Sequence, residues 1–219
     1  AALVVGLDVD RLRQPHGFEH AVLALQRLLR LGATADGKLL AIAHDALGQT
    51  SRFEDFTEHL VEWSGMLYHC DNVQLTYKLV PLDVFTPLDM RAPGAALGVI
   101  GLECAMDELA CALGMDPVQL RLVNYAERNQ NEDKPWSSKA LRECYSEGAE
   151  RFGWSQRNPE PRSMRDGRQL IGWGMAIWSV RPEKQALVAL VPVAFHLVMQ
   201  VTSLRADGSN ALGHFRSNR

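Results

Sequence analysis

The stretch Met90-Arg91-Ala92-Pro93-Gly94 is a turn that leads into a predicted helix over residues 99–113. One apolar stripe predicts this helix, with spacings of four, three and four residues between Leu102, Met106, Leu109 and Leu113. Glycines at positions 94, 98 and 101 allow the backbone to come close to a ligand or to another backbone segment. We therefore expect the fold to be organised around this turn and helix.

Arg91 makes the turn a candidate anion-binding site. Its guanidinium presents a fork of donors suited to phosphate or carboxylate, and backbone amides at a helix N-terminus also favour negative charge. A plain strand-to-helix connection with a solvated arginine explains the same residues. From these residues alone the plain connection is the better interpretation, because the spacing fits no strict phosphate-loop motif.

Several separate motifs between residues 27 and 178 occur in an order typical of one known family. They are the run from Leu79 to Glu127, Lys134-Pro135-Trp136-Ser137-Ser138, Leu141-Arg142-Glu143-Cys144, the run from Gly148 to Trp154, Arg165-Asp166-Gly167-Arg168 and Gly172-Trp173-Gly174-Met175-Ala176. With these motifs the chain resembles the molybdenum-cofactor-binding large subunit of the xanthine dehydrogenase and aldehyde oxidase family. Agreement of several motifs in order is more specific than any one of them alone.

The resemblance implies a fold class and a domain organisation. The expected fold is α+β, with short mixed or antiparallel sheets and a central group of helices. Residues 27–178 are expected to form part of the molybdopterin-binding domain. Residues 1–26 match the family poorly, and residues 179–219 are expected to be an altered or truncated C-terminal segment.

The resemblance also implies an activity, cofactors and partners. Family members oxidise aldehydes or heteroaromatic small molecules with oxygen derived from water, at a molybdenum–molybdopterin centre that carries the difficult chemistry. The cytosine dinucleotide form of the cofactor is one alternative. A 2Fe-2S subunit and an FAD subunit are expected as partners that take up the electrons. We expect a cytoplasmic protein, with the periplasm as the alternative if a partner subunit directs export.

Only the cofactor-binding turn of the family's site maps onto this sequence. Arg91, Ala92 and Gly94 are the expected cofactor-binding residues, although the match omits a phenylalanine of the animal enzymes. The family's general-base glutamate has no counterpart, so no catalytic residue and no metal ligand is assigned. Glu103, Glu108 and Glu127 are expected on a solvated helical face.

Two other functions compete with the enzyme hypothesis. The chain is alternatively a non-catalytic remnant that only folds or associates with partner subunits, because the base glutamate and a later glycine-rich loop have no counterpart. A weaker alternative is a small anion-binding module built on Arg91 and the helix end. Measuring the cofactor content of the protein distinguishes the enzyme from the non-catalytic remnant. Titration with phosphate tests the anion-binding module.

Composition excludes several classes of function. A net charge of −3 over 219 residues gives no reason to expect nucleic acid. The most apolar stretch, residues 186–201, contains Pro192 and His196 and is shorter than the roughly 20 residues of a membrane span. The cysteines form no Cys-x-x-Cys pair, so we expect no metal cluster bound by this chain alone. Cys104 and Cys111 are predicted to be buried.

Patterning predicts the remaining elements. Asp36-Gly37 predicts a hairpin between strands at 25–33 and 38–45, and His44 and Asp45 are expected to point to opposite faces as ordinary strand-end residues. Asp116 is predicted to cap a second helix that ends at Asn124. The other predictions are strands at 3–7, 73–80 and 172–178, a helix or helical turn at 53–65, a helix at 138–153, and a hairpin at 204–209.

Overall fold

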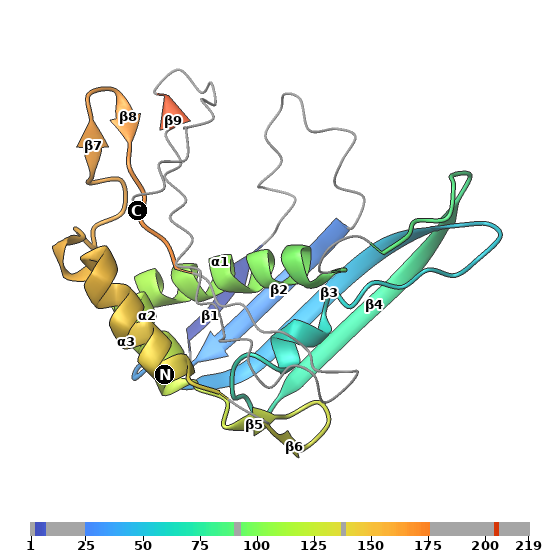
Figure 1. The fold of residues 1–219 in the computed structure, drawn as a ribbon, viewed down its shortest axis with the longest axis horizontal. Helices are drawn as coiled ribbons and strands as arrows, with labels where there is room; N and C mark the ends of the chain where they lie inside the picture. Colours follow the sequence, from blue (N-terminus) through green and yellow to red (C-terminus); the bar gives the residue numbers. More distant parts are fainter. Residues whose placement is uncertain (1–2, 8–24, 90–92, 137–138, 176–203, 206–219) are drawn as a thin grey trace. The chain divides into compact units, whose positions relative to one another are not determined.

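The computed structural model describes residues 3–7, 25–89, 93–136, 139–175 and 204–205 (Figure 1). The chain divides into two compact units, residues 1–139 and residues 140–219. The first unit contains the four-stranded sheet and the helices that follow it. The second unit contains one helix and a small sheet.

The four-stranded sheet has the order β1-β2-β3-β4. Its strands are β1 (Leu3–Leu7), β2 (Leu25–Ala33), β3 (Leu39–Ser51) and β4 (Val73–Leu82). β1, β2 and β3 pair in antiparallel fashion, whereas β3 and β4 are parallel. The predicted strands at 3–7, 25–33 and 73–80 are confirmed, and the strand predicted at 38–45 continues to residue 51.

The hairpin predicted at Asp36-Gly37 joins β2 and β3. Gly37 has a φ of +87°, a left-handed conformation that glycine adopts without steric cost. The amide of Gly37 donates to the Thr34 carbonyl at 3.0 Å, and the Thr34 amide donates to the Lys38 carbonyl at 2.9 Å. These bonds close the turn and set the register that pairs Ala33 with Leu39.

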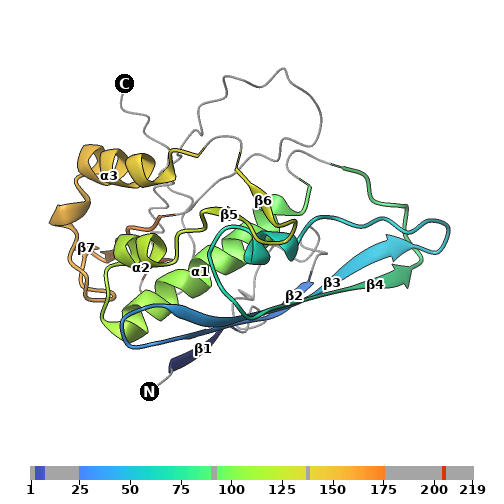
Figure 2. The ribbon, with the colours of Figure 1, turned by 90° about the horizontal axis from the view of Figure 1, so that it is seen from below.

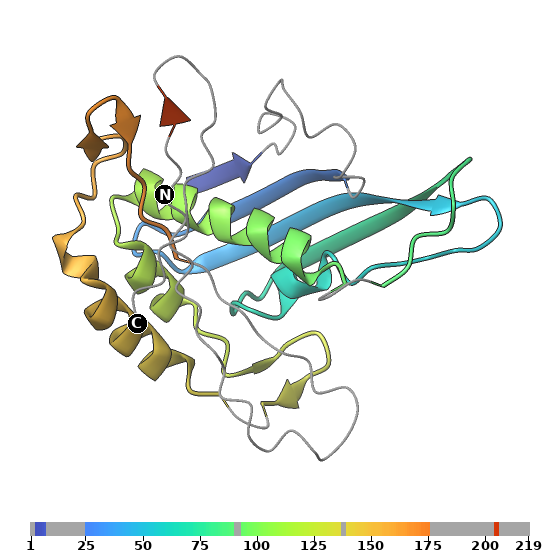
Figure 3. The ribbon, with the colours of Figure 1, turned by 45° about the horizontal axis from the view of Figure 1, so that its top comes forward.

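Helix α1 (Ala95–Leu113) crosses one face of the sheet, as the three views show (Figures 1, 2 and 3). It contacts β1 and β2. The predicted apolar stripe is buried at Leu102, Met106 and Leu109, which are all 0% exposed. Leu29 and Leu31 of β2 are equally buried. Burial of this stripe against the sheet is the main hydrophobic stabilisation of the first unit.

The helix or helical turn predicted at 53–65 forms only at its end, as the short 3-10 helix η2 (Glu62–Gly65). No helix covers residues 53–61. Thr50 Oγ1 accepts from the Phe56 amide at 2.9 Å. Ser51 Oγ accepts from the amides of Phe53 and Glu54 at 3.1 Å. These bonds tie the segment back to the end of β3.

Helix α1 ends as predicted and a second helix follows. Gly114 has a φ of +64° and its amide donates to the last carbonyls of α1. In α2 (Pro117–Val123) the Asp116 carboxylate accepts from the amides of Val118 and Gln119, which confirms the predicted cap. Val123, the last residue of α2, is 51% exposed. A two-residue hairpin follows, β5 (Arg128–Asn129) with β6 (Lys134–Pro135).

The second unit contains α3 (Leu141–Phe152), η3 (Trp154–Gln156) and an antiparallel sheet of three two-residue strands. The helix begins three residues later than predicted. The strands are β7 (Arg165–Asp166), β8 (Gln169–Leu170) and β9 (Leu204–Arg205). Residues 172–175 form no strand, contrary to prediction, and residues 176–178 lie outside the described residues.

The α+β expectation is confirmed, since short mixed sheets and three helices make up the described residues. No helix in the described part of the chain has both the length and the hydrophobicity of a membrane span. The apolar stretch 186–201 lies outside that part.

Gly98 allows the first turns of α1 to touch the backbone of residues 59–60. A Cβ at this position would lie 1.9 Å from the Leu60 carbonyl oxygen, which is closer than atoms can approach. The substitution Gly98→Ala must therefore push the helix away from Leu60.

We expect Gly98→Ala to lower the free energy of unfolding by at least about 2 kcal/mol, despite the better helix propensity of alanine. Urea unfolding of the two variants measures this change. Gly172→Ala is the matched control, because nothing lies within 4 Å of a Cβ there. An unchanged urea midpoint for Gly98→Ala would show that α1 can shift away from Leu60 without loss of stability.

Candidate functional site

Gly94 is the one predicted cofactor-binding residue that the structure describes; Arg91 and Ala92 lie outside the described residues. Gly94 precedes α1 with a φ of +67°, and its carbonyl accepts from the Gly98 amide at 2.8 Å. A Cβ on Gly94 would lie 2.6 Å from the carbonyl carbon of His59. Both glycines therefore serve a close approach between two backbone segments.

The amino end of α1 carries the partial positive charge of a helix N-terminus. Amides in the first turn of a helix have no intrahelical acceptor and carry partial positive charge. Gly94 offers no side chain to cap them, and no acidic residue lies in the first turn. The described part of the turn is therefore compatible with the phosphate group of a cofactor.

The close contact at Gly94 brings His59 to the turn, although the two residues are 35 positions apart in sequence. His59 Nδ1 lies 2.7 Å from Glu62 Oε2, and both side chains are partly exposed. The proximity of His59 to Gly94 depends on the fold and has no sequence signal.

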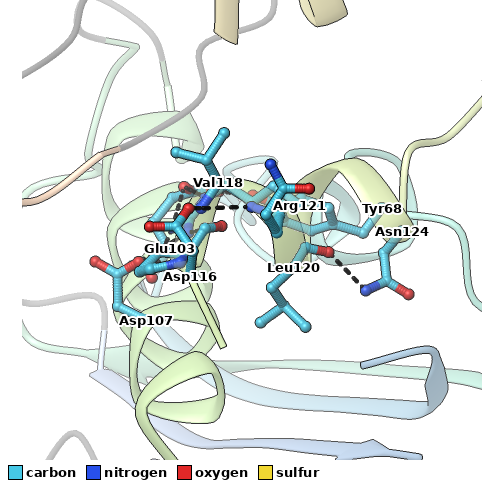
Figure 4. A network of polar contacts seen from close by, with 10 residues as sticks. Tyr68, Glu103, Asp107, Asp116, Val118, Leu120, Arg121 and Asn124 are labelled. Atoms are coloured by element: carbon cyan, nitrogen blue, oxygen red, sulfur yellow. Dashed lines mark hydrogen bonds and ion pairs between the residues drawn. The ribbon is translucent and has the colours of Figure 1, made fainter. Parts of the chain in front are cut away.

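A buried ionic network lies behind the turn, and its centre is Glu103 (Figure 4). The expectation that Glu103 is solvated was wrong, because the residue is 3% exposed. Its two carboxylate oxygens have separate partners. Oε1 accepts from the Tyr68 hydroxyl at 2.5 Å, and Oε2 accepts from Arg121 Nε and Nη2 at 3.0 and 2.9 Å.

Arg121 is fully buried, and acceptors surround its guanidinium. Besides the two bonds to the Glu103 carboxylate, Nη2 donates to the Glu103 carbonyl at 3.3 Å and Nη1 donates to the Pro117 carbonyl at 3.0 Å. Nη1 also forms an ion pair with Asp107 Oδ1 at 2.8 Å. Four hydrogen bonds and one ion pair thus surround the guanidinium, and such pairing makes a buried charge tolerable.

This network joins α1, α2 and the segment after η2. Burial raises the pKa of the Glu103 carboxyl above its ordinary value, while the charge of Arg121 and the Tyr68 hydroxyl oppose that rise. Glu103 is nine residues from Gly94 on the same helix. We assign the network a structural role, since it fixes the position of α1 along its own axis.

Asn124 connects α2 to the β2–β3 hairpin. Its Oδ1 accepts from the Leu39 amide at 2.8 Å, and its Nδ2 donates to the carbonyls of Gly37 and Leu120 at 2.8 Å. Its own carbonyl accepts from the His69 amide at 2.8 Å. The residue predicted only to end a helix therefore also holds the hairpin in place.

His44 lies in the middle of β3 and is completely buried, contrary to the prediction of an ordinary strand-end residue. Its Nδ1 lies 2.8 Å from Ser64 Oγ, and its Nε2 has no hydrogen-bond partner among the described residues. Leu29 and Leu75 are its neighbours on the adjacent strands. Burial lowers the pKa of His44 to about 4.

The remaining candidates do not converge on one site. Asp45 pairs with Arg30 at 3.5 Å on the face opposite His44, as predicted. Cys104 and Cys111 are exposed, contrary to prediction. Among the described residues, no three His, Cys, Asp or Glu side chains gather as a metal site.

Removing one partner of the buried Glu103–Arg121 ion pair should destabilise the folded state. We expect Arg121→Met to lower the free energy of unfolding by about 3–5 kcal/mol, because it leaves the Glu103 charge buried and unpaired. The double variant Glu103→Leu/Arg121→Met should recover much of that loss. Glu108→Gln, an exposed site on the same helix, is the control in the same urea titrations. Equal losses in the single and double variants would contradict the pairing.

His44 should make the fold sensitive to acid. Its pKa is about 4 in the folded protein and 6.5 when unfolded, so the unfolded state binds the proton first as the pH falls. The stabilisation is complete above pH 6.5 and is lost towards pH 4. The two pKa values correspond to about 3 kcal/mol.

Unfolding titrations at several pH values measure this dependence. We expect His44→Gln to remove the decrease in the free energy of unfolding between pH 6.5 and pH 4 that His44 causes. The control variant His69→Gln, at an exposed position, should retain this decrease. If the slope survives in the His44 variant, the histidine is not its source.

Comparison with known proteins identifies the family of this chain. The sequence model of the family described as "Molybdopterin cofactor-binding domain" matches residues 20–125. The chain is 38% identical over 164 residues to the aldehyde oxidoreductase molybdenum-binding subunit PaoC of Escherichia coli K12, covering 74% of this chain and 22% of PaoC. It is 28% identical over 157 residues to the xanthine dehydrogenase molybdenum-binding subunit of Escherichia coli O157:H7, covering 68% and 21%.

Solved structures give the same result. The aldehyde oxidoreductase of Desulfovibrio desulfuricans superposes with a TM-score of 0.52 and 27% identity, over 59% of this chain and 15% of that enzyme. The chain thus spans about a fifth of the length of the curated relatives it matches. By sequence and by fold, this chain belongs to the family of molybdopterin-binding large subunits that includes aldehyde oxidoreductase and xanthine dehydrogenase.

Proposed function

We propose that the polypeptide carrying this sequence, called the parent subunit below, is the large subunit of a molybdenum hydroxylase. It would oxidise aldehydes or heteroaromatic small molecules with oxygen derived from water. The observation that carries this proposal is the match of residues 20–125 to the molybdopterin cofactor-binding domain. Aldehydes are the favoured substrate class, because the aldehyde oxidoreductase subunit is more similar than the xanthine dehydrogenase subunit, at 38% against 28% identity.

Within the parent subunit, residues 27–178 would form part of the cofactor-binding domain. The turn of Arg91, Ala92 and Gly94 would bind the molybdopterin, in its cytosine dinucleotide form or in the shorter form. The amino end of α1, which has no side-chain cap bond, supports this placement, because the helix dipole favours the negative charge of a phosphate there. Arg91 would add donors in a planar fork that matches phosphate oxygens.

When bound, the molybdenum–pterin group supplies the oxidising centre, and the protein supplies binding and orientation. The close packing of Gly94 and Gly98 against residues 59–60 supports a rigid turn for such binding. The Glu103–Arg121 network would keep the turn in position by holding α1 against α2. No described residue is assigned as the general base of the reaction.

The partners of the parent subunit are proposed from the same relatives, which are named as molybdenum-binding subunits. Such a name implies other subunits, and we propose that these carry 2Fe-2S centres and FAD. The assembly would lie in the cytoplasm, or in the periplasm if a partner directs export. A non-catalytic segment that only associates with partners is the alternative.

The test is the molybdenum and pterin content of the parent subunit, purified after co-expression with its partner subunits. We expect stoichiometric cofactor in the wild type and roughly a tenfold or larger loss in Arg91→Gln, since a bond between a charged donor and phosphate is worth about 1.5–3 kcal/mol. Arg168→Gln, at an exposed arginine, is the matched control.

Three outcomes are informative. Wild-type protein without metal or pterin would refute the proposed function and leave the non-catalytic alternative. Full cofactor in Arg91→Gln would refute the role of the turn while the enzyme hypothesis stands. Loss in both arginine variants would point to a general effect of charge.

A further inference from the structure

The buried pair of His44 and Ser64 ties η2 to the middle of β3. Both side chains are 0% exposed, and His44 Nδ1 lies 2.8 Å from Ser64 Oγ. The short helix contacts β3, β4 and α1 and lies on the same side of the sheet as α1 (Figure 2). This hydrogen bond therefore helps to fix where η2 rests on the sheet.

The residues before η2 support the start of α1. We call residues 59–61 the seat of the helix. A Cβ on Gly98 would lie 1.9 Å from the Leu60 carbonyl oxygen, and a Cβ on Gly94 would lie 2.6 Å from the His59 carbonyl carbon. Both contacts join backbone to backbone, so no change of side-chain rotamer can absorb a movement of the seat.

The seat is linked directly to the His44–Ser64 pair. The Ser64 amide donates to the Val61 carbonyl at 3.0 Å. Leu60 and Val61 pack with Ala46, which lies two residues from His44 on the same face of β3. A displacement of η2 from the sheet would therefore move the seat as well.

A second attachment holds η2 from the loop of the β5–β6 hairpin. Asn131 Nδ2 donates to the Glu62 carbonyl at 2.9 Å, and Gln130 Nε2 donates to the Gly65 carbonyl at 3.3 Å. Amide side chains do not change charge with pH, whereas an imidazole does. Of these two attachments, the one through His44 is therefore the one that depends on pH.

His44 makes this attachment as a neutral ring. A neutral imidazole has one donor nitrogen and one acceptor nitrogen, whereas a protonated ring has two donors. Nε2 has no hydrogen-bond partner among the described residues, so a second N–H there would be buried without an acceptor. Burial accordingly lowers the pKa of His44 to about 4.

The charged groups around His44 do not reverse this preference. Asp45, the next residue of β3, favours the charged ring, but burial outweighs its effect. Asp45 also pairs with Arg30 on the opposite face of the sheet. The titratable side chains of β4, η2 and the segment before η2 interact with one another: Tyr77 lies in the field of Glu58 and Glu62, and Glu62 pairs with His59.

We propose that His44 is a positioning residue for the cofactor-binding turn, because its neutral ring holds η2 and the seat against the start of α1. Protonation of the ring would release η2 and loosen the seat while the rest of the unit stays folded. The effect on the cofactor rests on the proposed function, whereas the loosening of the seat requires only the fold.

Hydrogen–deuterium exchange of the parent subunit at pH 7 and pH 5 tests the loosening. The reporting amides lie in residues 59–67 and 94–101. After correction for chemical exchange rates, we expect opening there to increase roughly tenfold or more at pH 5, since an exposed ring is protonated below pH 6.5 and the buried ring only near pH 4. Helix α3 of the second unit should show no such increase. Unchanged opening of the seat overturns the proposal.

Variants identify the histidine that is responsible. We expect the acid-induced opening to disappear in His44→Gln and to persist in His59→Gln, the matched control within the seat itself. Ser64→Ala should open the seat already at pH 7. Opening that persists in His44→Gln, or disappears in His59→Gln, contradicts the proposal. If His44→Gln does not fold, wild type and His59→Gln still decide, because both must open in acid.

Cofactor retention links the seat to the turn. The loaded parent subunit, assembled with its partners, is passed through a desalting column at pH 7 and at pH 5, and its molybdenum and pterin are measured. We expect a several-fold greater loss at pH 5 in wild type and in His69→Gln, at an exposed histidine, than in His44→Gln.

The outcomes separate this inference from the proposed function. If wild-type protein contains no cofactor at pH 7, the proposed function fails, and hydrogen exchange still decides whether His44 holds the seat. If the seat opens in acid and the cofactor is retained equally at both pH values, the positioning role of His44 is refuted while the proposed function stands.

Discussion

The buried ion pair between Glu103 and Arg121 is the interaction on which the rest of the first unit depends. Two charges removed from water are tolerated only when every donor and acceptor around them is satisfied. Here the Tyr68 hydroxyl and the Pro117 carbonyl add hydrogen bonds to the pair, and the Asp107 carboxylate adds a second ion pair. The pair therefore permits one relative arrangement of α1 and α2, whereas an apolar contact would tolerate sliding.

Close backbone contacts add a second constraint at the other end of α1. Gly94 and Gly98 let the helix start against residues 59–60, where any side chain would collide. The ion pair holds α1 near its middle, and the glycines hold it at its start. Together they fix α1 from its start after Gly94, the described residue of the proposed cofactor contact. Rigidity of this kind limits the entropy lost when a ligand binds.

Buried polar groups of the first unit contrast with apolar side chains on its surface. Glu103, Arg121 and Asn124 are buried with partners for their polar atoms, while Phe53 and Phe85 are almost fully exposed. Satisfaction of the buried polar atoms is not complete, because His44 Nε2 has no hydrogen-bond partner among the described residues. A buried polar atom without a partner reduces stability.

The sequence alone determined the local elements and the family. Asp36-Gly37, the Asp116 cap and the stripe from Leu102 to Leu109 depend on residues close along the chain, and all three were predicted correctly. The burial of Glu103 and His44 could not be predicted, because their partners Arg121 and Ser64 are 18 and 20 residues away. Only tertiary structure decides such pairs, because they depend on which segments the fold brings together.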